Sequence, residues 1–437
     1  MTRALVLLLV GVAPSAFAQS APADETVEVP AEDPGDGYTP DEAQAEEALR
    51  FTGYVDLGFA KAMGSGSSFD PNDTRAPLDY GADAFAPAVN SRGEVASTDT
   101  GGRFVNGFLP RSVGIGSNAS FLINTASADV RFQPRGVPVF LFARLQLMPR
   151  FSSTGDATRV ELQQAFGRLS PFKNHEFAVF LGRFDSVFGI EYLENEANLR
   201  TNITPSLIAR YTTGHGLGAK AFYRLQLPSL WSAVSLNAAV TNNGTRIEAL
   251  VPIDANLSGA LVGSGRLGYE LNLQYVQLKA GFSALYGGRN DQRSTQVTQR
   301  ALGADFRFNA YGLSLAAELL WLWDDEGEGP RKLVGATASR ELVTGFTVWG
   351  GGWARAAYTL PWKWSTVTGI TVSGRYDRRE AQFDGFPKLV TDRVTLGAHV
   401  DLFDVVAVKA EYLFNRELAG AANVDNDVFT SSVVFTW

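Results

Sequence analysis

The stretch Phe51-Thr-Gly-Tyr-Val-Asp-Leu-Gly-Phe-Ala60 alternates between two kinds of side chain at every residue. Phe51, Val55 and Phe59 fall on one face, whereas Asp56 and other polar or small residues fall on the opposite face. A period of two residues is typical of a β-strand with one apolar side. This stretch therefore predicts a strand, and its pattern sets the template for the rest of the chain.

The same alternation recurs along the chain in about sixteen segments, so the predicted number of strands is about 14–18. Each segment has the length of about 9–11 residues that a membrane-spanning strand needs. The predicted strands begin near residues 51, 119, 138, 159, 176, 216, 232, 261, 275, 300, 313, 350, 366, 392, 405 and 428.

The connections between these segments alternate strictly between long and short. Long connections occupy residues 62–117, 149–158, 185–214, 242–260, 287–299, 324–348, 377–391 and 415–427. The short ones are Pro134–Gly136, Pro171–His175, Pro228–Ser229, Leu271–Gln274, Tyr311–Gly312, Pro361–Trp364 and Phe403–Asp404. Long extracellular loops and short periplasmic turns are typical of outer-membrane barrels. The sequence thus predicts an all-β fold, a transmembrane antiparallel β-barrel over residues 50–437, which must close because lipid leaves no partner for a free sheet edge.

Bulk composition agrees with a barrel and excludes several other classes. Mean hydropathy is −0.04, far below that of a helical membrane protein, because inward and outward residues of a barrel cancel. Charged residues make up 19% of the chain, below the roughly 25% of soluble domains. Cysteine is absent, which excludes disulfides, thiolate metal ligands and a cysteine nucleophile.

The first 49 residues differ from the remainder. Arg3, a short apolar run and the small-x-small site ending at Ala18 predict a cleaved signal peptide over residues 1–18. Residues 19–49 are acidic and predict a disordered periplasmic segment, or alternatively a partner-binding segment. Residues 1–49 carry one base against ten acids, so the rest of the chain has a net charge of only +1. Such a neutral body does not favour nucleic acid as a partner.

Aromatic residues gather near the ends of the predicted strands. The last predicted strand ends at Trp437 and resembles the C-terminal strand signature of outer-membrane proteins, which implies recognition by the barrel-assembly machinery. Interfacial girdles are predicted at Trp231, Trp321, Trp323, Trp362, Trp364, Tyr412 and Trp437.

Several fragments resemble Gram-negative porins, most closely the β-barrel porin and phosphate-selective porin group. They are Leu181–Glu191, Asn198–Arg200, Tyr211, His215–Leu217, Gly303–Arg307, Ala354–Tyr358 and Lys409–Asn415. The resemblance implies a channel for passive diffusion of small solutes or ions, often a homotrimer, among the lipid and lipopolysaccharide of the outer membrane. This chain departs from the pattern in its long first loop, residues 62–117, and in lacking a clear N-terminal coiled coil.

In porins of this architecture the third long loop commonly folds into the lumen, so residues 185–214 are the predicted constriction. The loop charges expected there are Asp185, Glu191, Glu194, Glu196, Arg200 and Arg210. The basic residues expected on the pore wall are Arg144, Lys220, Arg224, Arg307, Arg355, Arg375 and Arg393. Opposed charges at a constriction would set selectivity. Two readings remain open, an unselective wetting of the wall and a slight anion preference.

Enzymatic chemistry is not predicted. His399 and Asp401 share one strand face, but they lie near the short turn Phe403–Asp404 without a second carboxylate pair. The sequence also predicts no metal and no cofactor. Two alternatives to a general porin remain: a substrate-specific uptake channel, and a structural or adhesive barrel that binds a partner through residues 62–117.

Overall fold

The structure is a computed structural model in which residues 48–62, 119–148, 159–172, 175–228, 231–242, 259–288, 298–324, 329–330, 342–343, 347–362, 364–383, 388–418 and 427–437 are described. The predicted signal peptide, most of the acidic segment and all of the predicted loop 62–117 except its first residue lie outside these residues. The first strand begins at Ala48, so the prediction that residues up to 49 are disordered is wrong for its last two positions. No helix within the described ranges is long and apolar enough to cross a membrane.

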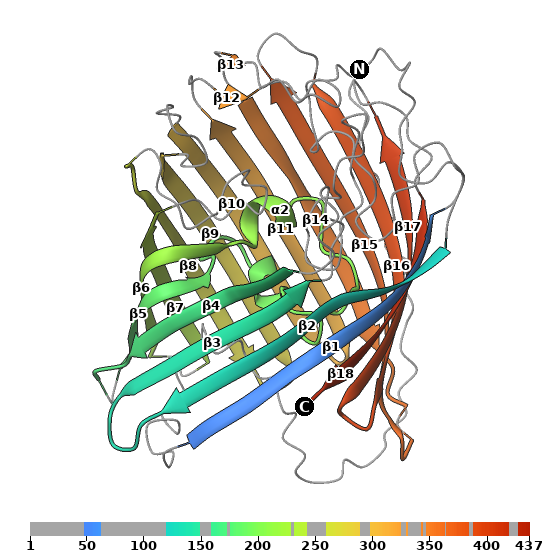
Figure 1. Cartoon of the computed structure of the whole chain (residues 1–437), viewed down its shortest axis with the longest axis horizontal. Coiled ribbons are helices and arrows are strands. Elements are labelled where there is room, and N and C mark those ends of the chain that lie inside the picture. The colour runs from blue at the N-terminus through green and yellow to red at the C-terminus, as the bar shows by residue number, and fades with distance from the viewer. Residues whose placement is uncertain are drawn as a thin grey trace.

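Sixteen antiparallel strands close into a barrel, which confirms the predicted fold class (Figure 1). Neighbours in sequence are neighbours in the sheet, and closure comes from pairing of the first strand with the last. The barrel strands are β1 (Ala48–Ala62), β2 (Ala119–Gln133), β3 (Val139–Met148), β4 (Arg159–Leu169), β5 (Glu176–Asp185), β6 (His215–Gln226), β7 (Ser232–Thr241), β8 (Val262–Leu273), β9 (Val276–Gly288), β10 (Thr298–Ala310), β11 (Leu313–Asp324), β14 (Thr347–Thr359), β15 (Val367–Phe383), β16 (Leu389–Leu402), β17 (Val406–Glu417) and β18 (Val428–Thr436).

All sixteen predicted starts lie within three residues of the observed ones. The main difference is at the predicted long connection 377–391, where β15 and β16 remain paired as far as Ala381 and Leu389. The predicted turn Leu271–Gln274 is also shifted, because β8 continues to Leu273. A separate two-stranded sheet of β12 (Gly329–Pro330) and β13 (Leu342–Val343) was not predicted.

Two short turns have two consecutive residues with positive φ: Tyr311–Gly312 is a two-residue hairpin, and the other turn has three residues, 403–405, between Leu402 and Val406. Tyr311 and Gly312 have φ values of 50° and 81°, and Phe403 and Asp404 have values of 53° and 59°. Two consecutive positive φ angles define the hairpin turn whose twist matches that of the flanking strands. The short connections therefore fix the register of β10 with β11 and of β16 with β17.

The two faces of the wall differ as the alternation requires. On β7, Ser235 and Asn237 are each 4% exposed and point into the lumen, whereas Leu236 and Val240 are each 50% exposed and point outward. The predicted girdle residues Trp231, Trp321, Trp362, Trp364 and Trp437 are likewise outward and about half exposed. The wall is thus apolar outside and polar inside, as a membrane barrel requires.

Candidate functional site

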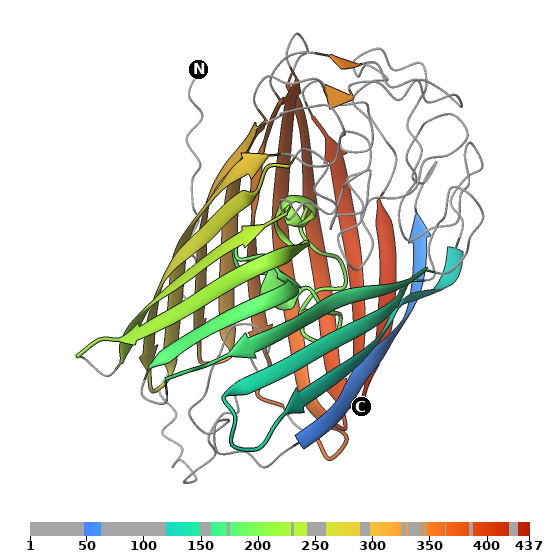
Figure 2. The same ribbon diagram turned by 60° about the vertical axis from the view of Figure 1, so that its left-hand side comes forward.

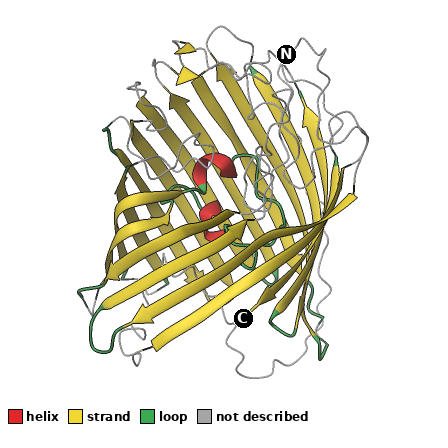
Figure 3. Ribbon diagram, viewed as in Figure 1, coloured by secondary structure: helices red, strands yellow, loops and turns green. Residues whose placement is uncertain are grey.

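The segment between β5 and β6, residues 186–214, lies inside the barrel. It contains the 3-10 helix η3 (Glu191–Glu194) and the short helix α2 (Ala209–Thr212), both surrounded by strands in Figures 2 and 3. Its two ends are joined where it leaves the wall: the Ser186 amide donates to the Gly214 carbonyl at 3.0 Å. Asp185 Oδ1 lies 2.9 Å from His215 Nε2 at the same place. We call residues 186–214 the lumen loop.

Apolar packing holds the root of the lumen loop. Phe142, Phe166, Phe180 and Phe222, from four successive strands, form a buried cluster with Phe184 and Val187. The ring centroids of Phe142 and Phe166 are 5.3 Å apart, and those of Phe166 and Phe180 are 5.5 Å apart. Lys220 Nζ lies 4.5 Å from the Phe180 ring centroid, so this predicted wall cation faces an aromatic ring. We call the set Phe142, Phe166, Phe180, Phe184, Val187 and Phe222, without Lys220, the phenylalanine cluster.

Glu194 joins the lumen loop to the facing wall through two guanidinium groups. Arg355 on β14 donates from Nη1 to Oε2 at 2.5 Å, and Arg307 on β10 donates from Nη2 to Oε1 at 2.6 Å. Burial alone would raise the pKa of Glu194, but the charges of Arg355 and Arg307 outweigh burial and lower it to about 2. The carboxylate therefore stays ionised at any physiological pH.

Glu411 on β17 holds the middle of the loop. One carboxylate oxygen accepts hydrogen bonds from the Asn202 side chain at 2.6 Å and the Ile203 amide at 2.7 Å. The other oxygen accepts from the amide of Thr204 at 3.0 Å and from its hydroxyl at 2.9 Å. Four donors on one carboxylate fix the backbone at this point, because each bond to a charged acceptor is stronger than a neutral one.

Basic residues of the same wall bind carbonyl groups of the loop. Arg375 on β15 donates to the Thr204 carbonyl at 2.7 Å and to the Pro205 carbonyl at 2.8 Å. Arg393 on β16 also donates to the Pro205 carbonyl. Lys409 on β17 donates to the carbonyls of Ala197 and Arg200. These cations replace the hydrogen bonds that loop carbonyls would otherwise make to water.

Glu196 reaches back to strands beside the closure of the barrel. Its carboxylate accepts hydrogen bonds from the Tyr54 hydroxyl on β1 and the Gln146 amide on β3. Arg144 Nη1 lies 2.9 Å from Glu196 Oε1, and the same guanidinium binds Asp129 Oδ1 at 2.7 Å. Glu196 therefore attaches the lumen loop to β1 and β3, away from the wall that holds Glu194.

Glu191 and Arg200 act within the loop. The Glu191 carboxylate accepts hydrogen bonds from the Ser206 amide at 2.6 Å and from the Ser206 hydroxyl. Burial raises the pKa of Glu191. Arg200 donates to the carbonyls of Glu194, Asn195 and Ile203, and burial lowers its pKa. Both residues therefore stabilise the folded shape of the loop. Arg210 belongs to α2, but its side chain lies outside the described residues.

Glu411 was not predicted as a site residue, and two further acidic residues that were not predicted also take part in this arrangement. Glu318 on β11 accepts the amides of Ile190 and Glu191, each at 3.0 Å. Asp377 on β15 binds Arg375 at 3.0 Å and Arg393 at 3.3 Å. Alternation along β11 was the available signal for Glu318, whereas Asp377 fell in the predicted long connection 377–391 and gave no such signal. Their partners in the loop were not visible from sequence.

Partly exposed charges line the lumen nearer the short turns. Arg224 Nη1 lies 2.9 Å from Glu176, its Nη2 lies 3.2 Å from Glu270, and Lys279 lies 3.8 Å from Glu270. These four side chains are 19–29% exposed. His399 and Asp401 are 2.8 Å apart on β16. Among the described residues no group of three or more His, Cys, Asp or Glu side chains is arranged to hold a metal.

Comparison with known proteins finds likeness in structure but not in sequence. No family model matches the chain, and no curated protein matches it. An anion-selective porin from Comamonas acidovorans is 11% identical with a TM-score of 0.51, over 90% of this chain and 100% of that one. The outer-membrane channel DcaP of Acinetobacter baumannii is 9% identical with a TM-score of 0.51, over 90% and 98%. The chain therefore has the fold of the outer-membrane porins.

Proposed function

We propose that the protein is an outer-membrane porin that forms a water-filled channel for passive diffusion of small hydrophilic solutes or ions. The observation that carries this proposal is a closed barrel of sixteen strands whose inner face bears partly exposed charge pairs, such as Arg224 with Glu176. Barrels of about eight strands fill with side chains, whereas barrels of about sixteen can leave an aqueous channel. Charged side chains that remain partly exposed need water in the lumen.

In this proposal the lumen loop is the constriction. Most of its side chains are buried, and the half-buried ones are Leu193, Glu194, Asn198, Leu199 and Thr201. The side chain of Glu194 is 14% exposed and that of its partner Arg307 is 23% exposed. The passage therefore runs along residues 193–201, where Glu194 and Arg307 present charge to a solute. The other predicted loop charges, Asp185, Glu191, Glu196 and Arg200, hold the loop in position.

We further propose that ion selectivity is weak. The wall cations Arg144, Arg355, Arg375 and Arg393 are no more than 7% exposed and bind carboxylates or carbonyl groups. The more exposed cations Arg224 and Arg307 each face a carboxylate at 2.6–2.9 Å. Paired charges present little net field to a passing ion. This favours the wetting role of the wall over an anion preference.

The cellular setting is part of the same proposal. Cleavage after Ala18 would release the chain into the periplasm, and the assembly machinery would recognise the strand that ends at Trp437. The outward face would contact outer-membrane lipid and lipopolysaccharide, and the barrel would assemble as a homotrimer. The outward apolar face and the half-exposed tryptophans at its edges support the membrane placement.

The test is single-channel conductance of the refolded chain, residues 19–437, in a planar bilayer under a KCl gradient. Long-lived steps with a small reversal potential are expected. A heat-modifiable, folded barrel that gives no conductance steps would overturn the channel and favour a structural or adhesive barrel. Steps blocked by one solute at micromolar concentration would instead favour a substrate-specific uptake channel.

A further inference from the structure

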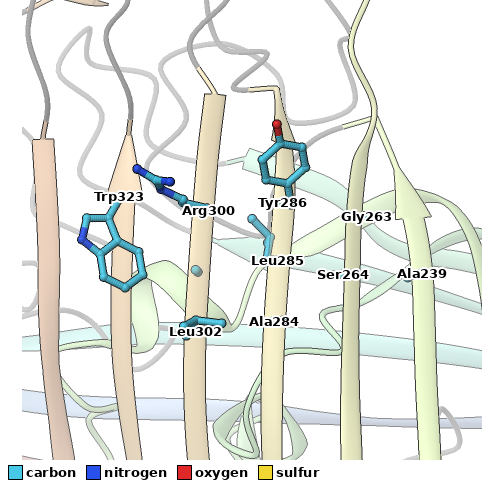
Figure 4. A pocket seen from close by; sticks show the side chains of 10 residues that line it. Ala239, Gly263, Ser264, Ala284, Leu285, Tyr286, Arg300, Leu302 and Trp323 are labelled. Atoms are coloured by element: carbon cyan, nitrogen blue, oxygen red, sulfur yellow. The ribbon is translucent and has the colours of Figure 1, made fainter.

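The outward surface of β8 to β11 carries a shallow groove near the ends of the strands that join the long connections (Figure 4). Its volume is about 510 Å³, and its outward lining residues are Gly263, Ala284, Tyr286, Arg300, Leu302 and Trp323. The neighbouring side chains Phe282 and Leu267 are 52% and 55% exposed on the same face. Tyr286 and Leu302 in the lining are 67% and 41% exposed, whereas the inward-pointing lining residues Ala239, Leu285 and Ala301 are buried, so the groove is open on the lipid-facing side.

Arg300 stands at the upper end of this groove between two aromatic residues. In the sheet it lies directly opposite Tyr286 on β9 and Trp323 on β11. The three side chains project from the same outer face in Figure 4. Arginine is costly on the lipid face of a barrel near the midplane but nearly neutral at the interface, where tyrosine and tryptophan gather. This trio therefore lies at the level of the lipid headgroups.

The rest of the groove is apolar: Gly263 lies beyond Tyr286 in the same cross-strand row as Arg300, and Ala284 and Leu302 lie in the next outward row below. A Cβ atom added at Gly263 would have its nearest neighbour at 3.8 Å, the Tyr286 carbonyl oxygen, so a side chain fits there with ordinary contacts. Ala284 is exposed on the next strand, and Leu302, 41% exposed, forms the far side. A trough of this kind fits a hydrocarbon chain lying along the wall.

We propose that this groove binds one phosphate-bearing lipid of the outer leaflet, with the phosphate on Arg300 and an acyl chain against Gly263, Ala284 and Leu302. The guanidinium of arginine matches the oxygens of a phosphate and forms charge-assisted hydrogen bonds with them. The aromatic rings of Tyr286 and Trp323 flank the headgroup. The inference uses the outer-membrane placement proposed above, but it does not depend on conduction, because the groove lies outside the lumen.

Native mass spectrometry of the folded protein, titrated with lipid A in detergent, tests the proposal. One lipid A is expected to remain bound to the wild-type chain. Arg300→Gln removes the charge, and Ala284→Leu or Gly263→Leu fills the trough without reaching the lumen. Each is expected to weaken binding about tenfold, the effect of losing one hydrogen-bonded charge or a comparable apolar contact. Heat-modifiable migration confirms that each variant is folded.

The matched control is Arg416→Gln, which removes an exposed arginine of β17 opposite Asp392. Unchanged lipid A binding in this variant, with loss in the Arg300 and trough variants, supports the site. Equal losses in the Arg300 and Arg416 variants would overturn it, because the effect would then be one of net charge. Equal retention of fully dephosphorylated lipid A would also overturn it. Conductance is measured beside binding, so a failure of the channel proposal is seen separately.

Discussion

The two walls that hold the lumen loop use different physics. On β3 to β6 the phenylalanine cluster packs the loop root through rings 5.3–5.5 Å apart. On β10 to β17 the loop is held by Arg355, Glu411, Arg375 and Lys409, through charge-assisted hydrogen bonds. Apolar burial is roughly proportional to area and has no preferred direction, whereas hydrogen bonds to charged groups are directional. The aromatic wall therefore supplies stability, and the charged wall sets the position of the loop.

The largest expected effect is on the aromatic wall. Phe180→Ala removes a ring that is 2% exposed and leaves a cavity, so the free energy of unfolding should fall by about 3–5 kcal/mol. Urea unfolding in lipid vesicles measures it. Leu181→Ala, at an outward residue 63% exposed, is the control and should cost much less. Equal losses of unfolding free energy in the two variants would show that the phenylalanine cluster stabilises the barrel no more than an ordinary lipid-facing side chain does.

A smaller loss is expected on the charged wall. Glu411→Gln replaces one of the two carboxylate oxygens by an NH2 group, which cannot accept a hydrogen bond from Asn202, Ile203 or Thr204. The free energy of unfolding should fall by about 1.5–3 kcal/mol. Current traces should become noisier because the loop is less fixed. Glu270→Gln, which alters a partly exposed ion pair, should leave both stability and noise nearly unchanged. A quiet trace from Glu411→Gln would contradict the positioning role.

The third effect is on ion selectivity, and it comes with some loosening of the loop at Glu194. Glu194→Gln removes the carboxylate between Arg307 and Arg355 and leaves positive charge beside the proposed passage. The reversal potential under a KCl gradient should move toward anions. One unit charge at 4 Å in water is worth about 1 kcal/mol, so the permeability ratio should change by less than about fivefold. A shift toward cations would refute this assignment of Glu194.

The smallest expected effect is that of pH above about 4.5. The pKa of Glu194 is lowered to about 2 in the folded loop, below its ordinary value. A lowered carboxyl pKa adds stability that is complete above the unfolded pKa and is lost as pH falls through the folded value. Conductance should therefore be constant from pH 7 to about 4.5, with the loop loosening only as pH falls toward 2. Loosening near pH 6 would contradict this ion pair.

Most of the fold could be predicted from the sequence, because a two-residue period is a local property. Segments such as the one that begins at Phe51 carry their own face assignment, and turns such as Tyr311–Gly312 carry their own backbone preference. The extension of β15 to Phe383 was missed because Arg378 and Glu380 are charged on the outward face. Arg378 and Glu380 form an ion pair at 2.9 Å. Charged residues at outward positions break the apolar alternation, so hydropathy alone predicts a loop there.

The charged residues of the site could be predicted, but their partners could not. Alternation placed Arg307, Arg355 and Arg375 on the lumen face. It could not show that Glu194 lies between the first two, since these contacts span more than a hundred residues. Loop geometry depends on tertiary contacts and not on local pattern. The phenylalanine cluster was missed for a related reason, because apolar residues on the lumen face run against the expected alternation.

The loop contacts on β1 and β17 bear on the order in which the barrel is built. Closure joins β1 to β18, which are separated by most of the chain, and pairings of such long separation form slowly. Glu196 binds Tyr54 on β1, and Lys409 on β17 binds the carbonyl of the next residue, Ala197. One short segment thus touches strands on both sides of β18. The loop would act as an internal template that brings the two ends of the sheet together before the last seam is sealed.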